Sequence, residues 1–120
     1  NNKKITFLGV TFKAGTDDMR ESPALNIIPI LIKKGATIYY YDPSGEKKIF
    51  TSKKIMYCNN IKDACNNSDL LIIHTEWNEF KQLNFKKLVG RKNLKVFDMR
   101  NLYSPEKMEK INIKYFGIGR

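Results

Sequence analysis

The sequence predicts a doubly wound, Rossmann-like α/β domain with a mostly parallel sheet and helices on both of its faces. Short β-rich runs alternate with helical patterns along the whole chain, and this alternation is typical of βαβ units. The run LLIIHT at 70–75 is apolar on both faces, as a central parallel strand should be. The 120 residues are enough for one hydrophobic core, so we expect 1–120 to form a single domain.

The predicted strands are short runs rich in β-branched, aliphatic or aromatic residues. In a doubly wound sheet, ligands bind beyond the carboxyl ends of the strands, near the point where the strand order reverses. The segments 11–21, 42–43, 74–77 and 98–101 follow predicted strands, so they are the candidate site segments. The predicted strands are Ile5–Val10, Thr37–Tyr41, Lys54–Tyr57 (the weakest), Leu70–Thr75, Lys95–Asp98 and Ile113–Phe116.

Helices are expected between these strands. The first is predicted to begin with Ser22 as N-cap and Pro23 at its first position, and to end at Gly35. Pro29 lies inside this pattern, where it removes one main-chain hydrogen bond. The other predicted helices begin at Asn60, cover roughly 77–89 with a break near Asn84, and begin at Ser104-Pro105.

The chain is strongly basic, with a formal net charge of +10. A nonenzymatic nucleic-acid-binding module is therefore one alternative. Lysine outnumbers arginine, however, and occurs in scattered doublets without an arginine-rich stripe or interleaved aromatic residues. We favour a solvated basic surface and expect no nucleic-acid partner.

Neither a membrane partner nor a metal is expected. No apolar stretch is long enough to span a bilayer, and no signal-peptide pattern opens the chain. Cys58 and Cys65 have neither zinc-site nor disulfide spacing, which favours ordinary packing in a reducing cytoplasm. Because the chain opens with Asn1 rather than a methionine, we expect a fragment of a longer protein.

The loop after the first predicted strand carries charges where a dinucleotide site would carry glycines. The stretch FLGVTFKAGTDDMRESP at 7–23 contains Gly9 and Gly15 but not the G-x-G-x-x-G fingerprint. A strand, a loop and a helix follow one another as in a dinucleotide site. The sequence thus raises the question of what charged side chains do where the phosphate-binding glycines would lie.

Lys13 and Arg20 are the cations of this loop that could bind phosphate. Lysine acts on phosphate as a point charge and arginine as a fork, and the N-terminus of the following helix adds main-chain N–H groups. The alternative is a surface salt network with the acids of the same loop, which are Asp17, Asp18 and Glu21. The charges alone leave both alternatives open.

Three further residues end other predicted strands. Arg100 could reach the same cleft as Lys13, or it could brace Asp98. Asp42 lies about where a dinucleotide site places its ribose-binding acid, but without the glycine fingerprint we favour an Asp-Pro turn. His74 has no nucleophile or carboxylate at motif spacing, so a packed histidine is favoured.

Several motifs, in order, resemble the carboxy-terminal domain of the UDP-glucose/GDP-mannose dehydrogenases. They are FKAGTDDMRESP, YYYDP, HTEWNEF, FDMRNLY and YFGIGR, and together they span essentially the whole chain. TEWNEF and DMRNLY look most like the members that oxidise UDP-glucose. The members that act on GDP-mannose or on N-acetylated UDP-sugars remain the alternatives.

The resemblance implies an NAD-dependent oxidoreductase that converts UDP-glucose to UDP-glucuronate through a cysteine thioester, with a role in polysaccharide biosynthesis. In this family an amino-terminal domain holds NAD and the carboxy-terminal domain holds the nucleotide of the sugar. Nothing here matches the catalytic-cysteine motif, so no catalytic residue is assigned and the fragment alone is expected to be inactive. Its expected partners are the missing amino-terminal and central domains, with a homo-oligomer at full length.

The resemblance also implies roles for particular residues. Phe12 and Lys13 correspond to contacts with the UDP-sugar, and Arg100 matches an arginine that meets the same substrate. Arg20 corresponds to a residue that reaches NAD across the interdomain cleft. Met99 departs from the family pattern, because many members have glycine before that arginine, and its bulkier side chain is expected to alter the approach to the substrate slightly.

Overall fold

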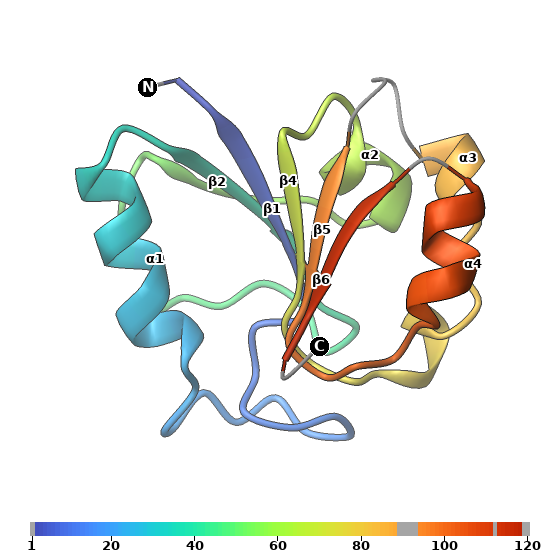
Figure 1. The fold of residues 1–120 in the computed structure, drawn as a ribbon. Helices are drawn as coiled ribbons and strands as arrows, with labels where there is room; N and C mark the ends of the chain where they lie inside the picture. The colour runs from blue at the N-terminus through green and yellow to red at the C-terminus, as the bar shows by residue number, and fades with distance from the viewer. Residues whose placement is uncertain (1, 89–93, 112, 119–120) are drawn as a thin grey trace.

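The computed structural model describes residues 2–88, 94–111 and 113–118, and it contains the predicted doubly wound sheet. Six parallel strands pair in the order β3-β2-β1-β4-β5-β6 (Figure 1). The strand order therefore reverses between β1 and β4. The strands are β1 (Lys4–Leu8), β2 (Thr37–Tyr41), β3 (Ile55–Tyr57), β4 (Leu70–Ile73), β5 (Lys95–Asp98) and β6 (Lys114–Gly117).

Helices cover both faces of the sheet, as predicted. Figure 1 shows α1 on one side of the sheet and α2, α3 and α4 on the other. Each side has its own apolar core, one around Phe7 and Ile28 and the other around Leu71 and Phe80. The helices are α1 (Ala24–Lys33), α2 (Ile61–Cys65), the 3₁₀ turn η1 (Asn78–Phe80), α3 (Phe85–Leu88) and α4 (Pro105–Lys110).

Most of the predicted helix boundaries agree with the structure. The side chain of Asn60 caps α2 by accepting from the N–H of Asp63 at 2.8 Å, and Ser104 caps α4. Gly35 follows the last turn of α1 with a φ of 100°, the left-handed conformation that favours glycine after a helix. The segment predicted as a broken helix over 77–89 forms η1 and α3 around the expected break, and Val89 lies outside the described residues.

The predicted N-cap of α1 is wrong. The helix begins at Ala24, and Pro23 occupies the cap position. Ser22 instead places its hydroxyl between two elements, donating to the carbonyl of Val10 and accepting from the N–H of Ala24 at 3.2 Å. The hydroxyl therefore joins the end of β1 to the start of α1.

β1 and β4 both end earlier than predicted, and this places the loops that follow them. Gly9 has a φ of 80°, which turns the chain out of the sheet before Val10. After Ile73, the N–H of His74 donates to the carbonyl of Leu8 at 3.0 Å, which holds the two strand ends together. The chain segments that leave β1 and β4 thus start side by side at the carboxyl edge of the sheet.

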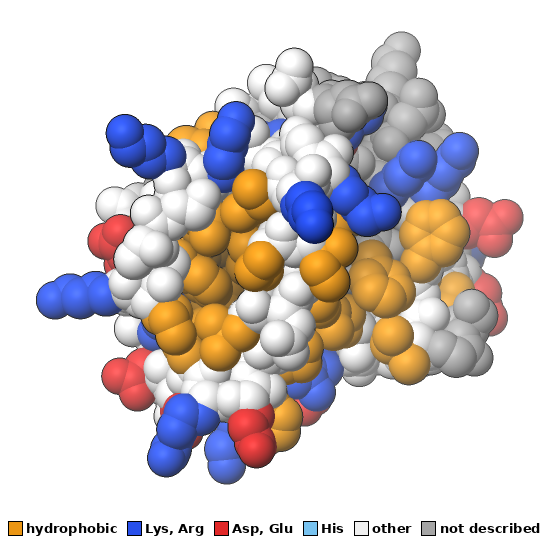
Figure 2. Space-filling model, turned by 90° about the vertical axis from the view of Figure 1, so that its left-hand side faces the viewer, with side chains coloured by type: hydrophobic (Ala, Val, Ile, Leu, Met, Phe, Trp, Pro, Cys, Tyr) orange, Lys and Arg blue, Asp and Glu red, His pale blue; other side chains and the backbone are white. Residues whose placement is uncertain are grey.

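Apolar side chains gather on the outer surface beside α1 (Figure 2). Ile30 and Ile49 are 56% and 57% exposed, and a shallow groove of about 590 Å³ runs between α1 and the segment 49–55. Lys33 is the one charged side chain among the described residues that line this groove. The groove therefore lacks the clustered cations that a phosphate ligand needs.

Among the described helices, none has the length and apolar character needed to cross a membrane.

Candidate functional site

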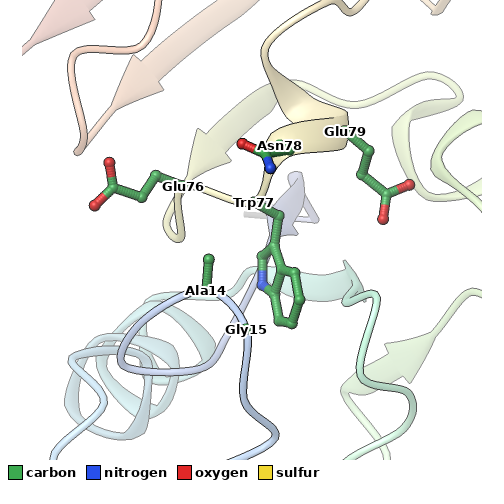
Figure 3. A pocket seen from close by; sticks show the side chains of 6 residues that line it. All are labelled: Ala14, Gly15, Glu76, Trp77, Asn78 and Glu79. Carbon is green, nitrogen blue, oxygen red and sulfur yellow. The ribbon is translucent and has the colours of Figure 1, made fainter.

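A hollow of about 470 Å³ opens at the carboxyl edge of the sheet, where the strand order reverses (Figure 3). Ala14 and Gly15 line it from the loop that follows β1, and residues 76–79 line it from the segment that follows β4. Ligands of doubly wound sheets bind at this position. Ala14, Gly15, Glu76 and Trp77 fall within the candidate segments that the sequence indicated, whereas Asn78 and Glu79 lie beyond them in the segment predicted as a helix.

The first residue of the loop after β1 is fixed at both of its main-chain groups. The N–H of Val10 donates to the carboxylate of Asp42 at 2.8 Å, and the carbonyl of Val10 accepts from the hydroxyl of Ser22. Both partners are almost fully buried. Side chains from the end of β2 and from the start of α1 therefore set the direction in which the chain leaves β1.

The next two residues of the loop are held from the opposite side of β1. The hydroxyl of Thr75 donates to the carbonyl of Thr11 at 2.8 Å, and Nη2 of Arg100 donates to the carbonyl of Phe12 at 2.8 Å. These side chains come from the ends of β4 and β5. The main chain of 10–12 is thus fixed from both sides of β1 before it reaches Lys13.

Gly9 is required by the close approach of Thr75 and by its own backbone conformation. A Cβ at Gly9 would lie 2.5 Å from the Cβ of Thr75, and the φ of 80° already disfavours a side chain there. The absence of a side chain at Gly9 therefore leaves space for Thr75, which hydrogen-bonds to the loop.

Phe12 and Lys13 lie on the exposed side of this fixed segment. Phe12 is 45% exposed, although its main chain is held by Arg100. Lys13 is exposed and forms no ion pair with another described residue, and its carbonyl accepts from the hydroxyl of Thr11 at 2.9 Å. An unpaired ammonium group on a fixed main chain is suited to bind an anion.

Arg20 differs from Lys13 because it is paired within its own loop. Its Nη2 lies 2.9 Å from Oδ2 of Asp18, and its Nε donates to the same carboxylate at 3.1 Å. This hydrogen bonding lowers the pKa of Asp18 to about 2. The side chain of Arg20 is 89% exposed. The salt-network alternative thus describes Arg20 in this structure. Lys13 forms no ion pair with a described residue, but its charge contributes to the lowered pKa of Asp18.

Arg100 joins the ends of strands instead of bracing Asp98 with its guanidinium. Nε of Arg100 donates to the carbonyl of His74 at 3.0 Å, in addition to the bond with Phe12. The carboxylate of Asp98 accepts hydrogen bonds from the main-chain N–H of Arg100 at 3.0 Å and from the hydroxyl of Tyr115 at 2.6 Å. A guanidinium has five N–H groups, so Arg100 retains donors beyond those used on these carbonyls.

Asp42 and His74 have structural roles, as favoured from the sequence. Asp42 accepts from the N–H of Ser44 at 2.9 Å in an Asp-Pro turn, besides holding Val10, and it is 1% exposed. His74 is fully buried, and burial, with a smaller contribution from Arg100, lowers its pKa to about 4. The imidazole is therefore neutral near pH 7.

The wall opposite the loop is aromatic and acidic, which the sequence analysis did not anticipate. Trp77 lines the hollow and packs on the apolar core, and its Nε1 is buried without a hydrogen-bond partner among the described residues. Glu79 accepts from the hydroxyl of Tyr41 at 3.1 Å, while Glu76 is exposed (Figure 3). The sequence signal for this wall was the position of 74–77 directly after a predicted buried strand. Nothing in the described ranges groups histidine, cysteine and acidic side chains as a metal site would.

The chain is similar to nucleotide-sugar dehydrogenases in sequence and in fold. The model of one protein family, described as UDP-glucose/GDP-mannose dehydrogenase family, UDP binding domain, matches residues 6–105. The UDP-glucose 6-dehydrogenase of Rickettsia conorii is 40% identical over 121 residues, covering 98% of this chain and 28% of that protein.

Solved structures give the same picture of the fold. A UDP-D-ManNAc dehydrogenase from Pyrococcus horikoshii superimposes with a TM-score of 0.78 at 26% identity, over 99% of this chain and 26% of that one. An NDP-N-acetyl-D-galactosaminuronic acid dehydrogenase from Methanosarcina mazei superimposes with a TM-score of 0.86 at 23% identity, over 100% and 25% of the two chains.

The fold is that of a Rossmann-like domain, and its candidate site is the hollow at the reversal of strand order. The chain belongs to the UDP-glucose/GDP-mannose dehydrogenase family, and it corresponds to the UDP binding domain of that family. It spans 28% of the length of the Rickettsia conorii relative.

Proposed function

We propose that this domain holds the nucleotide of a UDP-sugar for an NAD-dependent dehydrogenase that oxidises UDP-glucose to UDP-glucuronate. The observation that carries the proposal is the unpaired ammonium of Lys13, which stands on a fixed main chain beside the hollow at the strand-order reversal. The names of the curated relatives support UDP-glucose as the substrate.

In this proposal Phe12, Lys13 and Arg100 bind the substrate. The ammonium of Lys13 and the remaining N–H donors of Arg100 offset the charge of the diphosphate, and the exposed ring of Phe12 provides an apolar wall. Glu76 and Glu79 line the hollow from the segment that follows β4, and their carboxylates can accept from hydroxyl or N–H groups of the nucleoside.

Arg20 is assigned to NAD. Its guanidinium is exposed, and its partner Asp18 is a surface carboxylate, so the ion pair can exchange for a phosphate of a cofactor bound by another domain. The residues that form the thioester and the main NAD site belong to parts of the enzyme outside this chain. We further propose that the full-length enzyme is a homo-oligomer of the cytoplasm, where the free thiols of Cys58 and Cys65 would stay reduced.

An N-acetylated UDP-sugar is the second candidate substrate. It is favoured by the structural similarity to the UDP-D-ManNAc dehydrogenase of Pyrococcus horikoshii. GDP-mannose is a weaker alternative, supported by the family description. The base and the sugar distinguish these candidates, because all of them carry a diphosphate.

Calorimetric titration of the intact protein with UDP, UDP-glucose, GDP, NAD and duplex DNA at two salt concentrations tests the proposal. We expect saturable UDP and UDP-glucose binding that exceeds GDP binding. Stronger binding of GDP would favour the GDP-mannose alternative. DNA binding that falls steeply with salt, without UDP binding, would overturn the proposal and favour a nucleic-acid-binding module.

A further inference from the structure

We propose that Thr75 is a positioning residue whose hydroxyl holds the segment 11–13 in the shape that the UDP-sugar requires. The inference rests on the proposed function, because it concerns the loop that carries Phe12 and Lys13. Thr75 itself is fully buried behind that loop and is not assigned to the ligand.

The hydroxyl of Thr75 has one orientation. It donates its single hydrogen to the carbonyl of Thr11 at 2.8 Å, and its oxygen lies 2.9 Å from Nδ1 of His74. Since the hydrogen is used on Thr11, the contact with His74 requires the imidazole to donate from Nδ1. The bonds on both sides fix the hydroxyl between the end of β4 and the loop after β1.

The constraint continues from Thr11 to Lys13. The carbonyl of Thr11 accepts from Thr75, and the hydroxyl of Thr11 donates to the carbonyl of Lys13 at 2.9 Å. Consecutive hydrogen bonds therefore lead from the buried end of β4 to the residue that bears the unpaired ammonium. If the first bond is lost, the segment that leads to Lys13 loses one of its links to the sheet, while the bond from Arg100 to the carbonyl of Phe12 remains.

Thr75 packs closely against Gly9. A Cβ built on Gly9 would lie 2.5 Å from the Cβ of Thr75. The side chain of Thr75 therefore lies against the main chain just beyond β1, in addition to forming its hydrogen bonds. A substitution that keeps the shape and removes the hydroxyl isolates the hydrogen-bonding role.

Thr6 is a matched control for this substitution. It is also fully buried, and its hydroxyl also donates to a main-chain carbonyl, that of Ala64 at 2.7 Å. Thr6 pairs in register with Leu71, so Thr75 lies four residues further along, roughly 13 Å away at the rise of a strand. Thr6 anchors α2 and takes no part in the loop after β1.

The test compares Thr75→Val, Thr75→Ser and Thr6→Val in the intact protein, with UDP affinity measured by calorimetry and stability by thermal unfolding. We expect both valine variants to lower Tm. Thr75→Val should also weaken UDP binding about tenfold, the effect of losing one well-placed hydrogen bond. Thr6→Val should leave UDP affinity within about twofold of the original, because distant sites contribute independently. Thr75→Ser retains the hydroxyl and should restore most of the affinity.

Two results would overturn the positioning role. Unchanged UDP affinity in Thr75→Val with a lowered Tm would make Thr75 a purely structural residue like Thr6. Equal weakening in Thr75→Ser and Thr75→Val would mean that the hydroxyl is not the cause. If Thr75→Val fails to fold, Thr75→Ala replaces it as the variant without a hydroxyl, and its UDP affinity is compared with that of Thr75→Ser. Absence of UDP binding in the unsubstituted protein would instead overturn the proposed function, and the inference with it.

Discussion

The loop after β1 has two halves that are held in different ways. In the proximal half, 10–13, the main chain is fixed by the buried side chains of Asp42, Thr75 and Ser22 and by the half-buried side chain of Arg100 at the end of β5. In the distal half, 16–20, the side-chain hydrogen bonds are local, from the N–H of Asp18 to Thr16 and between Arg20 and Asp18. The loop thus combines a rigid cationic position at Lys13 with an adaptable one at Arg20.

This difference matches the division of ligands in the proposed function. A substrate that must react in a fixed geometry benefits from preorganised contacts. A cofactor that another domain brings to the cleft needs a contact that can form when the domains close. A side chain paired on the surface, such as Arg20, meets that requirement at little cost.

The largest expected effect compares Gly9, which precedes the proximal half, with Gly15, which precedes the distal half. Gly9→Ala should destabilise the protein by about 2–5 kcal/mol, because the new Cβ meets Thr75 and the φ is left-handed. Gly15→Ala is the matched control, since Gly15 has a similar φ of 83° and nothing within 4 Å of the added Cβ. It should cost only about 1–2 kcal/mol, the price of the backbone conformation alone. Urea unfolding measures both, and equal losses would contradict the close approach at Gly9.

The second prediction concerns the buried imidazole behind the proximal half. Burial lowers the pKa of His74 to about 4 from an ordinary value of 6.5, so the unfolded chain binds more protons between these values. Stability should therefore fall as the pH is lowered from about 6.5 to about 4, by at most about 3 kcal/mol. His74→Asn, whose amide can replace the Nδ1 donor, should remove this part of the pH dependence. The measurement is denaturant unfolding at several pH values. If the free energy of unfolding of His74→Asn depends on pH as in the original protein, other groups cause the pH dependence.

The third prediction tests the unpaired cation directly. Lys13→Ala in the intact protein should weaken UDP binding by about 1.5–3 kcal/mol, because a charge-assisted contact is lost from a partly desolvated site. The melting temperature should change little, since Lys13 is exposed and forms no ion pair with a described residue. Unchanged UDP affinity with a lowered melting temperature would make Lys13 a structural residue.

The fourth and smallest prediction separates the two arginines by steady-state kinetics. Arg20→Ala should mainly raise the apparent KM for NAD, and Arg100→Ala should mainly raise that for UDP-glucose, each by about tenfold or more. Arg100→Ala also removes the hydrogen bond to the carbonyl of Phe12. Part of the rise in the KM for UDP-glucose is therefore expected to come from a displaced proximal half. Equal effects of both variants on both ligands would mean that these arginines serve domain closure or folding.

The order and type of the main elements could be read from the sequence because periodicity and apolar runs are local signals. The residues at which β1 and β4 end could not be predicted in this way. Val10 and Thr75 continue apolar or β-branched runs, but Gly9 turns the chain away, and the polar groups of Val10 and Thr75 are used on neighbouring segments. Ser22 looks like a helix cap because it precedes a proline, yet its hydroxyl also bonds the distant carbonyl of Val10.

For the candidate site, the rule about strand ends located the segments but not their contacts. Lys13 and Arg100 could be singled out because each follows a predicted strand. The bond between Thr75 and Thr11 joins residues 64 positions apart, and that between Arg100 and Phe12 joins residues 88 positions apart. No local pattern encodes such pairs, since they depend on the strand order that places β4 next to β1 and β5 next to β4.

A crystal structure of the intact protein with UDP tests the central claim most directly. We expect the diphosphate within hydrogen-bond distance of the Lys13 ammonium, with the nucleoside beside the hollow between 14–15 and 76–79. The proximal half should keep its main-chain position, with Thr75 still bonded to Thr11. UDP bound at another edge of the sheet, or a proximal half rebuilt around the ligand, would contradict the account.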